Sequence, residues 1–420
     1  MREMKDSGIA WIGAIPNHWK VSKIKQIVCW KSVKGQPDLP VLSLYRDYGV
    51  VPKDSRDDNH NVTSLDTSGY IVVERGDLVI NKMKAWQGSL AVSEYNGIVS
   101  PAYHICKITS EKICKKYLHY LLHDASYLPE YMRLSTGLRV GQWDLSFDDF
   151  KNIPFLVPPL AEQDRIAAFL DAECAEIDAV LEKTRASIEE YKKLKQAVIT
   201  QAVTKGVRGD RPMKDSGIEW IGEIPAEWDV LNLVAHTSML TPMRDRPENL
   251  DGPIPWVRIE DFEGKYIESS KAGLGVSMKT VKEMNLKVYP VGTILCTSSC
   301  IMGKCAIVSR ELVSNQRFIG IIPDRTTDKT YLYYLMTSNA ERMNFLSTGA
   351  LQANLSRSAF EHLKVQFPPY SEQQEIVAYL DDKCEKIDAL IARKQQYLTE
   401  IENYKKSLIY EYVTGKKEVV

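Results

Sequence analysis

One long phrase occurs twice in this chain, and the repeat limits its possible folds more than any other feature. Residues 4–21 read MKDSGIAWIGAIPNHWKV, and residues 213–230 read MKDSGIEWIGEIPAEWDV. Thirteen of these 18 aligned positions are identical. Self-similarity over a fixed distance identifies a repeated structural unit, so we expect the chain to fold as two similar halves.

The repeat extends over nearly the whole chain. FLVPPLAEQDRIAAFLDAECAEIDAVL (155–181) matches VQFPPYSEQQEIVAYLDDKCEKIDALI (365–391), so residues 4–206 correspond to residues 213–416. Each half starts with short β-like runs separated by Gly, Pro, Asn and Asp, and continues after a Pro-Pro pair as a long helical stretch.

These changes in sequence pattern predict an α+β chain of four parts. Residues 1–157 and 207–366 are the two similar globules, and residues 158–206 and 367–416 are two long helices. A pseudo-two-fold internal repeat relates the halves.

Both helices carry an apolar seam with alternating steps of four and three residues, in which eight of eleven positions are apolar. The first seam is Ile166, Leu170, Glu173, Ile177, Leu181, Thr184, Ile188, Tyr191, Lys195, Val198 and Ala202. The second is Ile376, Leu380, Lys383, Ile387, Ile391, Lys394, Leu398, Ile401, Lys405, Leu408 and Tyr412. This spacing is typical of a coiled coil. The alternative is that each helix packs only on its own globule.

The charges favour an antiparallel pair. Residues 162–182 contain seven acids and one base, whereas residues 183–195 contain five bases and two acids. Each acidic start would then meet the basic end of the other helix. A hypothetical register places Glu173 beside Lys405, with Lys195 beside Lys383. Such a pair would hold two similar globules around a pseudo-two-fold axis, which suits duplex DNA with two half-sites.

Composition excludes several classes of protein. No stretch has the roughly 20 apolar residues that span a membrane, and the N-terminus has no apolar secretory region. The eight scattered cysteines fit a reducing cytoplasm. A net charge of −1 gives no general attraction to nucleic acid, so any DNA contact must depend on local patches.

The motifs resemble those of the specificity subunit of Type I restriction–modification systems over nearly the full length. They are the two MKDSGIxWIGxIPxxW openings, NKMKAWQGSLAV with VSPAYHI, STG followed by LS, PPLAEQ, PPYSEQQ and KQAVITQAVTKG. The arrangement of two divergent globules separated by two similar helices is the specific part of this likeness.

The resemblance implies a DNA-binding subunit, without chemistry of its own, in the cytoplasm of a bacterium or archaeon. Each globule would be a target-recognition domain for one half of a bipartite, asymmetric site in double-stranded DNA. The coiled coil would set the spacer and dock two methyltransferase subunits that modify adenine at N6. Restriction subunits would complete an ATP-dependent endonuclease. S-adenosylmethionine, ATP and Mg are expected on the partner subunits, and no cofactor is expected on this chain.

The residues themselves contain no convincing catalytic or metal motif. FPPY (367–370) has Phe where an adenine methyltransferase needs Asn or Asp, and neither a cofactor fingerprint nor a phosphate-binding loop is present. Cys296, Cys300 and Cys305 lack a fourth ligand nearby, and they fit a β-strand better than a zinc site.

Candidate base-reading residues lie where the two halves differ within a shared frame. Between STG and LS, the first half reads LRVGQWD and the second reads ALQAN. Arg or Lys suits guanine, and Asn or Gln suits adenine. The predicted DNA-binding residues of the first half are Arg46, Lys82, Lys84, Trp86, Gln87, Arg139, Gln142 and Trp143. Those of the second half are Ser298, Ser299, Lys304, Asn315, Gln316, Arg317, Gln352, Asn354 and Arg357.

Three alternatives remain. The candidate loops are also consistent with ordinary exposed turns. The whole chain is also consistent with a coiled-coil scaffold that has no DNA role, or with a self-contained adenine methyltransferase. The tryptophans of the openings, Trp11, Trp19, Trp220 and Trp228, do not differ between the halves. We therefore expect them to pack each globule against the helices rather than to read bases.

Overall fold

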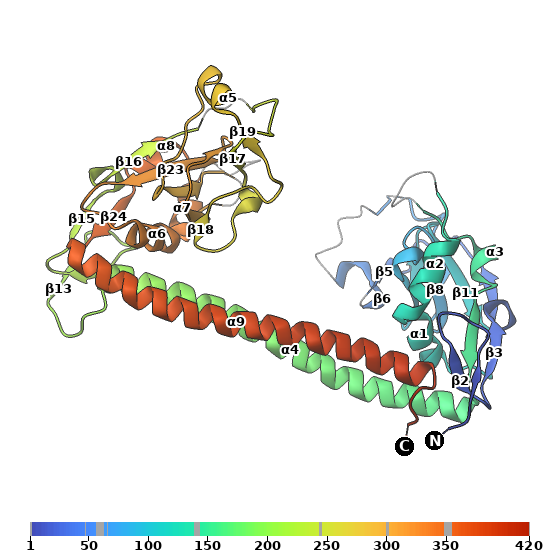
Figure 1. Cartoon of the computed structure of the whole chain (residues 1–420). Helices are drawn as coiled ribbons and strands as arrows, with labels where there is room; N and C mark the ends of the chain where they lie inside the picture. The colour runs from blue at the N-terminus through green and yellow to red at the C-terminus, as the bar shows by residue number, and fades with distance from the viewer. Residues whose placement is uncertain are drawn as a thin grey trace. The chain divides into compact units, whose positions relative to one another are not determined.

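The structure is a computed structural model that describes residues 2–46, 48–55, 63–64, 66–137, 143–242, 246–299, 302–347 and 355–419. The chain divides into two compact units. Unit 1 comprises Met1–Arg185 and Gln396–Val420, and unit 2 comprises Ala186–Gln395. Each unit contains one globule and a part of both long helices, α4 (Leu160–Lys205) and α9 (Tyr370–Val413) (Figure 1).

The centre of unit 1 is an antiparallel sheet buried on both faces. Its order is β4-β11-β8-β9, formed by Val28–Lys31, Tyr103–Ile108, Asp77–Asn81 and Leu90–Val92. Leu78 and Ile80 of β8 pack in the core that includes the long helices, whereas Val79 packs in a second core on the opposite face. The period of two along a strand produces this division.

Unit 2 repeats the same sheet. The order β16-β23-β20-β21 is formed by Thr237–Leu240, Phe318–Pro323, Ile294–Thr297 and Cys305–Val308, and β18 (Tyr266–Ile267) adds a parallel edge beside β21. Cys296 and Cys305 are buried, directly opposed positions of β20 and β21. They are core residues, as the sequence predicts, and the described residues contain no cluster suited to hold a metal ion.

Smaller elements surround each sheet. Unit 1 has helices α1 (Lys115–His123), α2 (Leu128–Leu134) and α3 (Phe147–Phe150), and strand pairs β1–β2 (Met4–Asp6, Ala14–Pro16), β3–β12 (Lys20–Lys23, Pro154–Val157), β5–β6 (Leu42–Tyr45, Gly49–Pro52) and β7–β10 (Ile71–Val73, Gly97–Val99). Unit 2 has helices α5 (Met278–Glu283), α6 (Lys329–Ser338), α7 (Ala340–Leu346) and α8 (Arg357–Glu361), strand pairs β13–β14 (Met213–Asp215, Glu223–Pro225) and β15–β24 (Asp229–Asn232, Lys364–Phe367), and a sheet of β19 (Gly275–Val276), β17 (Ile254–Val257) and β22 (Val313–Ser314).

The long helices pair as an antiparallel coiled coil in both units, as predicted. In unit 1, Lys405 Nζ of α9 lies 2.7 Å from Asp178 Oδ1 of α4. In unit 2, Lys195 Nζ of α4 lies 2.6 Å from Asp388 Oδ2 of α9. The basic end of each helix therefore meets the acidic start of the other.

The predicted register is wrong. The salt-bridge partner of Lys405 is Asp178 rather than Glu173, and the partner of Lys195 is Asp388. The cross-helix contacts are therefore displaced from the predicted ones, and both lysines have an aspartate partner. The buried position of each helix also differs locally from the predicted seam by one residue. Cys174 is buried where the seam predicts the half-buried Glu173, and Cys384 is buried where it predicts the exposed Lys383. A helix has 3.6 residues per turn, so a strict 3.5-residue pattern drifts around it.

A buried carboxylate at the start of α4 attaches the opening phrase of unit 1. Glu162 accepts a hydrogen bond from Trp19 Nε1 at 3.1 Å, lies 2.9 Å from His18 Nε2 and pairs with Arg2. Burial alone would raise the pKa of Glu162, but hydrogen bonds from His18, Arg2 and Trp19 outweigh burial and lower its pKa. Trp19 itself is fully buried.

Unit 2 makes the same attachment at the start of α9. Glu372 accepts a hydrogen bond from Trp228 Nε1 at 2.9 Å and pairs with Arg211, whose guanidinium lies 5.2 Å from the Trp228 ring. Trp228 is fully buried. The glutamates recur in PPLAEQ and PPYSEQQ because each one binds the repeated opening phrase.

The structural role predicted for the four opening tryptophans is confirmed for Trp19 and Trp228. Trp11 is half-buried, with its ring 6.3 Å from that of Tyr127. For Trp220 the expectation is wrong: 43% of the residue is exposed, and Arg342 lies over its ring at 3.8 Å. The indole of Trp220 packs against the half-buried Arg342 rather than in the core.

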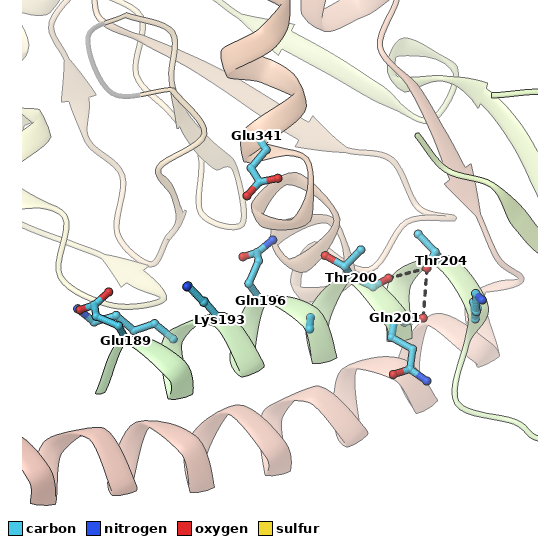
Figure 2. Close-up of a pocket in the computed structure, with 10 residues that line it drawn as sticks. Glu189, Lys193, Gln196, Thr200, Gln201, Thr204 and Glu341 are labelled. Atoms are coloured by element: carbon cyan, nitrogen blue, oxygen red, sulfur yellow. Dashed lines mark hydrogen bonds and ion pairs between the residues drawn. The ribbon is translucent and has the colours of Figure 1, made fainter. Parts of the chain in front are cut away.

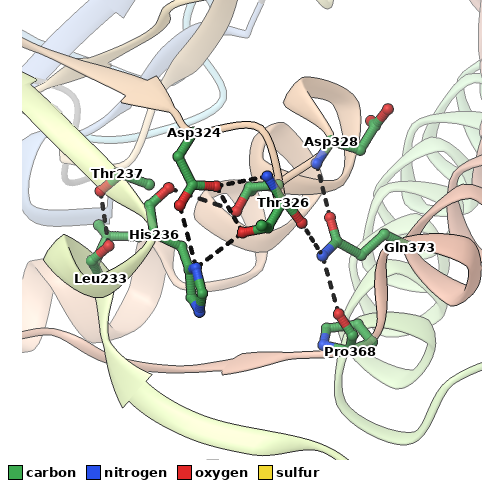
Figure 3. A network of polar contacts seen from close by, with 9 residues as sticks. Leu233, His236, Thr237, Asp324, Thr326, Asp328, Pro368 and Gln373 are labelled. Atoms are coloured by element: carbon green, nitrogen blue, oxygen red, sulfur yellow. Dashed lines mark hydrogen bonds and ion pairs between the residues drawn. The ribbon is translucent and has the colours of Figure 1, made fainter.

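The glutamine after each glutamate fixes a loop of its globule. In unit 2, Gln373 Oε1 accepts from the Asp328 amide at 2.7 Å, and Nε2 donates to the carbonyls of Thr326 and Pro368 at 3.0 Å each (Figure 3). In unit 1, Gln163 makes the equivalent bonds to Cys114, Lys112 and Pro158. Each long helix is thus joined to its globule through two consecutive buried side chains.

Within the described ranges, no helix combines the length and apolar character that crossing a membrane requires.

Replacing Trp228 with Phe should destabilise unit 2, because the buried Glu372 carboxylate loses the hydrogen bond from the Trp228 indole N–H. The expected cost is about 1–3 kcal/mol, or a fall of roughly 2–10 °C in the melting temperature. Trp220→Phe is the matched control, since its exposed indole has no such role, and it should leave the melting temperature nearly unchanged. Equal effects of the two substitutions, measured by calorimetry, would contradict the role of the buried bond.

Candidate nucleic-acid interface

Three segments that are distant in sequence meet at one backbone junction in unit 1. The Lys82 amide, just after β8, donates to the Ala102 carbonyl at 3.2 Å. The Leu145 amide, just before α3, donates to the Lys82 carbonyl at 2.9 Å. The junction brings together NKMKAWQG (81–88), SPAYH (100–104) and the residues before α3.

Unit 2 contains the same junction. The Ser298 amide, after β20, donates to the Arg317 carbonyl at 2.8 Å, and the Leu355 amide, before α8, donates to the Ser298 carbonyl at 2.9 Å. The bonds involve only main-chain atoms, so the side chains at the junction are free to differ between the units. The frame with variable content that the sequence indicates is therefore present in the structure.

The junction of unit 1 presents basic, amide and aromatic side chains. Lys84 and Gln87 are exposed, and Lys82 is half-buried. Trp86 and Trp143 form an edge-to-face pair with ring centroids 5.3 Å apart, and Trp86 Nε1 donates to the Met83 carbonyl at 3.1 Å. The predicted residues of this loop thus gather on one surface.

The junction of unit 2 presents a different set. Gln316 and Arg317 are exposed, and Asn315 uses its side-chain oxygen to accept from the Arg317 amide at 3.1 Å. Lys304 is exposed, with its ammonium 6.0 Å from the Phe262 ring. Arg357 is exposed at the start of α8, where Nε donates to Glu361 Oε1 at 2.7 Å.

Some predicted residues are placed differently or lie elsewhere. Ser298 is buried at 7% exposure, so its contribution to the junction comes from its backbone, and Ser299 is half-buried. Arg46 follows β5, where its carbonyl lies 2.6 Å from His123 Nε2 of α1, away from the junction bonds. The predicted residues that fall outside the described ranges are Arg139, Gln142, Gln352 and Asn354.

Residues that the sequence did not single out extend the surface of unit 1. His104 Nε2 lies 3.1 Å from the Leu145 carbonyl, and its ring contacts Phe147 with centroids 6.0 Å apart. Phe147 in turn stacks with Trp30 of β4. The sequence could have indicated Phe147, because it follows the LS of the first half at the position that Arg357 occupies in the second.

His104 is held neutral at ordinary pH. Burial lowers its pKa below 6.5, and nearby Lys82 lowers it further, against the opposing effects of the Leu145 carbonyl and Asp144. A carbonyl only accepts hydrogen bonds, so Nε2 carries the proton and donates to Leu145. His104 is therefore a neutral side chain that connects the Leu145 carbonyl to the ring of Phe147.

His236, Asp324 and Thr326 in unit 2 superficially suggest a catalytic triad (Figure 3). His236 Nδ1 lies 3.3 Å from Asp324 Oδ2 and 2.9 Å from Thr326 Oγ1. In a triad, the acid and the nucleophile occupy different ring nitrogens, whereas here both oxygens approach the same one. The cluster instead shapes the loop that Gln373 holds.

A groove of about 730 Å³ runs along α4 in unit 2, with Glu341 of α7 on its other side (Figure 2). Its α4 wall carries Lys192, Lys193, Gln196 and Thr200. The residues along this groove are polar or charged, except for Ala197.

The two repeated units and their junctions define a class of protein with two related recognition domains on paired helices. The comparisons specify it: the family model described as the Type I restriction modification DNA specificity domain matches twice, over residues 16–190 and 229–403. The chain belongs to this family.

Relatives agree with this assignment. The chain is 35% identical to the Type I restriction enzyme MjaIX specificity subunit of Methanocaldococcus jannaschii over 176 residues, 39% of this chain and 40% of that relative. It is 24% identical to the MjaVIII specificity subunit of the same organism over 434 aligned residues, 96% of this chain and 94% of the relative. A solved chain of a type I R-M system has a TM-score of 0.73 at 13% identity, covering 96% of this chain and 99% of its own length, so it shares the fold.

Replacing His104 with Gln should make unit 1 less sensitive to acid. The folded pKa lies below the unfolded value of about 6.5, so the unfolded state binds a proton first as the pH falls, and stability drops by at most about 1.4 kcal/mol per pH unit. The melting temperature of the wild type should therefore fall more between about pH 7 and about pH 5.5 than that of His104→Gln. Parallel pH profiles for the two proteins would contradict the depressed pKa.

Proposed function

We propose that this chain is the non-catalytic specificity subunit of a Type I restriction–modification complex, and that each unit reads one half of a bipartite, asymmetric DNA site. The observation that carries this proposal is the repeated junction. The same backbone hydrogen bonds hold different exposed side chains in the two units.

The side chains on each junction are of the types that read base edges. Lys84 and Gln87 in unit 1, and Gln316 and Arg317 in unit 2, supply donors suited to guanine and adenine. Because the two sets differ, the two half-sites should differ in sequence. The half-buried Lys82 and the exposed Lys304 would contact phosphates and fix the register on the duplex.

The paired helices would set the distance between the half-sites and dock two methyltransferase subunits. The polar groove along α4 supports a protein contact there. S-adenosylmethionine, ATP and Mg would be bound by the methyltransferase and restriction subunits in the cytoplasm. Binding to DNA is largely electrostatic. Because the net charge of this chain is −1, it would depend on those partners for part of its affinity for DNA.

A genome-wide map of N6-methyladenine, with and without the gene, tests the proposal. Deleting the gene should abolish methylation at one split, asymmetric motif, and restoring the wild-type gene should return it. If no split motif disappears in a strain whose methyltransferase subunit is active, the proposed function is wrong.

Restoring the gene with Lys84→Ala and Gln87→Ala should lower the methylated fraction of that motif or relax one half of it. Losing one base contact costs about 1–3 kcal/mol, roughly 5- to 150-fold in affinity. Lys112→Ala is the matched control, since Lys112 is exposed beside the attachment of α4 and away from the junction. It should restore full methylation.

A further inference from the structure

An aromatic pair, the exposed Trp30 and the half-buried Phe147, lies beside the junction of unit 1. Trp30 lies on β4, the edge strand of the sheet, and is 54% exposed. Its ring stacks with that of Phe147, with centroids 6.3 Å apart and planes at 29°. Exposing so much aromatic surface is unfavourable in water, so a partner that covers it would be stabilised.

The pair is continuous with the DNA interface proposed above, and the inference rests on that proposed function. The Phe147 ring contacts the ring of His104, whose Nε2 donates to the Leu145 carbonyl at 3.1 Å. The Leu145 amide donates to the Lys82 carbonyl at 2.9 Å. Direct contacts therefore link Trp30 and Phe147 to the loop that carries Lys84 and Gln87.

The corresponding positions of unit 2 carry different chemistry. Trp30 is opposite Cys106 in the β4–β11 ladder, and Met239 is opposite Ile321 in the equivalent β16–β23 ladder. Met239 is buried. Phe147 and Arg357 are each the first residue of a short helix whose N-cap serine accepts from the main chain.

The same place thus holds an apolar pair in one unit and an exposed arginine in the other. Arginine reads the two acceptors of guanine, whereas an aromatic side chain makes an apolar contact with the 5-methyl group of thymine. Lys151 lies 6.0 Å from the Phe147 ring and pairs with Asp148, so the edge of the aromatic pair carries a neutralised charge.

We propose that Trp30 and Phe147 are specificity-determining residues that recognise a thymine methyl group in the half-site read by unit 1. The occupant of this apolar surface is double-stranded DNA. The readout is a contact with one methyl group rather than a hydrogen bond to a base edge.

The test uses the complete complex of this chain with its methyltransferase subunits and a duplex containing the methylated motif. Each thymine of the unit 1 half-site is replaced in turn by deoxyuridine, which lacks only the 5-methyl group. One replacement should weaken binding by wild-type protein about fourfold, the effect of one buried methyl-sized group. Replacing a thymine of the other half-site by deoxyuridine should not affect the contact with Trp30 and Phe147.

Trp30→Ala and Phe147→Ala should bind the thymine duplex more weakly and should no longer distinguish it from the deoxyuridine duplex. Trp30→Ala keeps the test decisive if Phe147→Ala fails to fold, because the Trp30 side chain is largely exposed. Tyr95→Ala is the matched control: Tyr95 is another exposed aromatic residue of unit 1, at 44%, and its removal should preserve the deoxyuridine effect.

Phe147→Arg adds a gain-of-function arm, because it places in unit 1 the residue that unit 2 has there. The methylated motif should lose its preference for thymine at one position of one half-site and accept guanine.

Two results would overturn the inference while leaving the proposed function intact. One is wild-type binding to the motif that no deoxyuridine replacement in the half-site changes. The other is normal discrimination by Trp30→Ala and Phe147→Ala together with weaker assembly with the methyltransferase subunits, which would assign the pair to a protein contact. Failure of the wild-type complex to bind the motif at all would instead overturn the proposed function.

Discussion

Two buried glutamates, Glu162 and Glu372, determine how each globule is joined to its long helix. A buried carboxylate is stable only when donors surround it. In unit 1 the opening phrase supplies Trp19 and His18, and Arg2 just before the phrase completes the set. In unit 2 they come from Trp228 and Arg211. The opening phrase and the start of the helix therefore form one polar contact, and this constraint explains why both motifs recur in the two halves.

The attachment gives each unit a rigid frame, and the junction adds variable content to it. Backbone hydrogen bonds at Lys82 and at Ser298 hold the same three segments together irrespective of the side chains. The exposed side chains of the junction can then differ between the units without loss of the fold. A frame shared by the two units, with different side chains on it, suits two recognition domains with different targets.

The repeat, the long helices and their antiparallel pairing could be predicted from the sequence, because periodicity and charge act locally along a helix. The register could not, since it depends on pairing Lys405 with Asp178 and on a local drift of the seam toward Cys174. The exposure of Trp220 could not be predicted either, because its contact with Arg342 joins two residues that are distant in the sequence.

The site shows the same limit of sequence reasoning. Lys84, Gln87, Gln316 and Arg317 are predicted from the differences between the halves, and the structure exposes all four. Trp30 and Phe147 are not predicted, since only folding brings the two rings together. Residue type alone also misplaced the buried Ser298 on the surface.

We expect each unit to read its own half of the DNA site within a fixed frame. The most direct measurement replaces residues 22–150 with the corresponding segment of another specificity subunit and maps N6-methyladenine across the genome. This segment lies between the opening phrase and α4, so the Glu162 attachment is retained. We predict that one half of the methylated motif changes while the other half and the spacing remain the same. A change in both halves, or an unchanged motif in an active complex, would contradict the account.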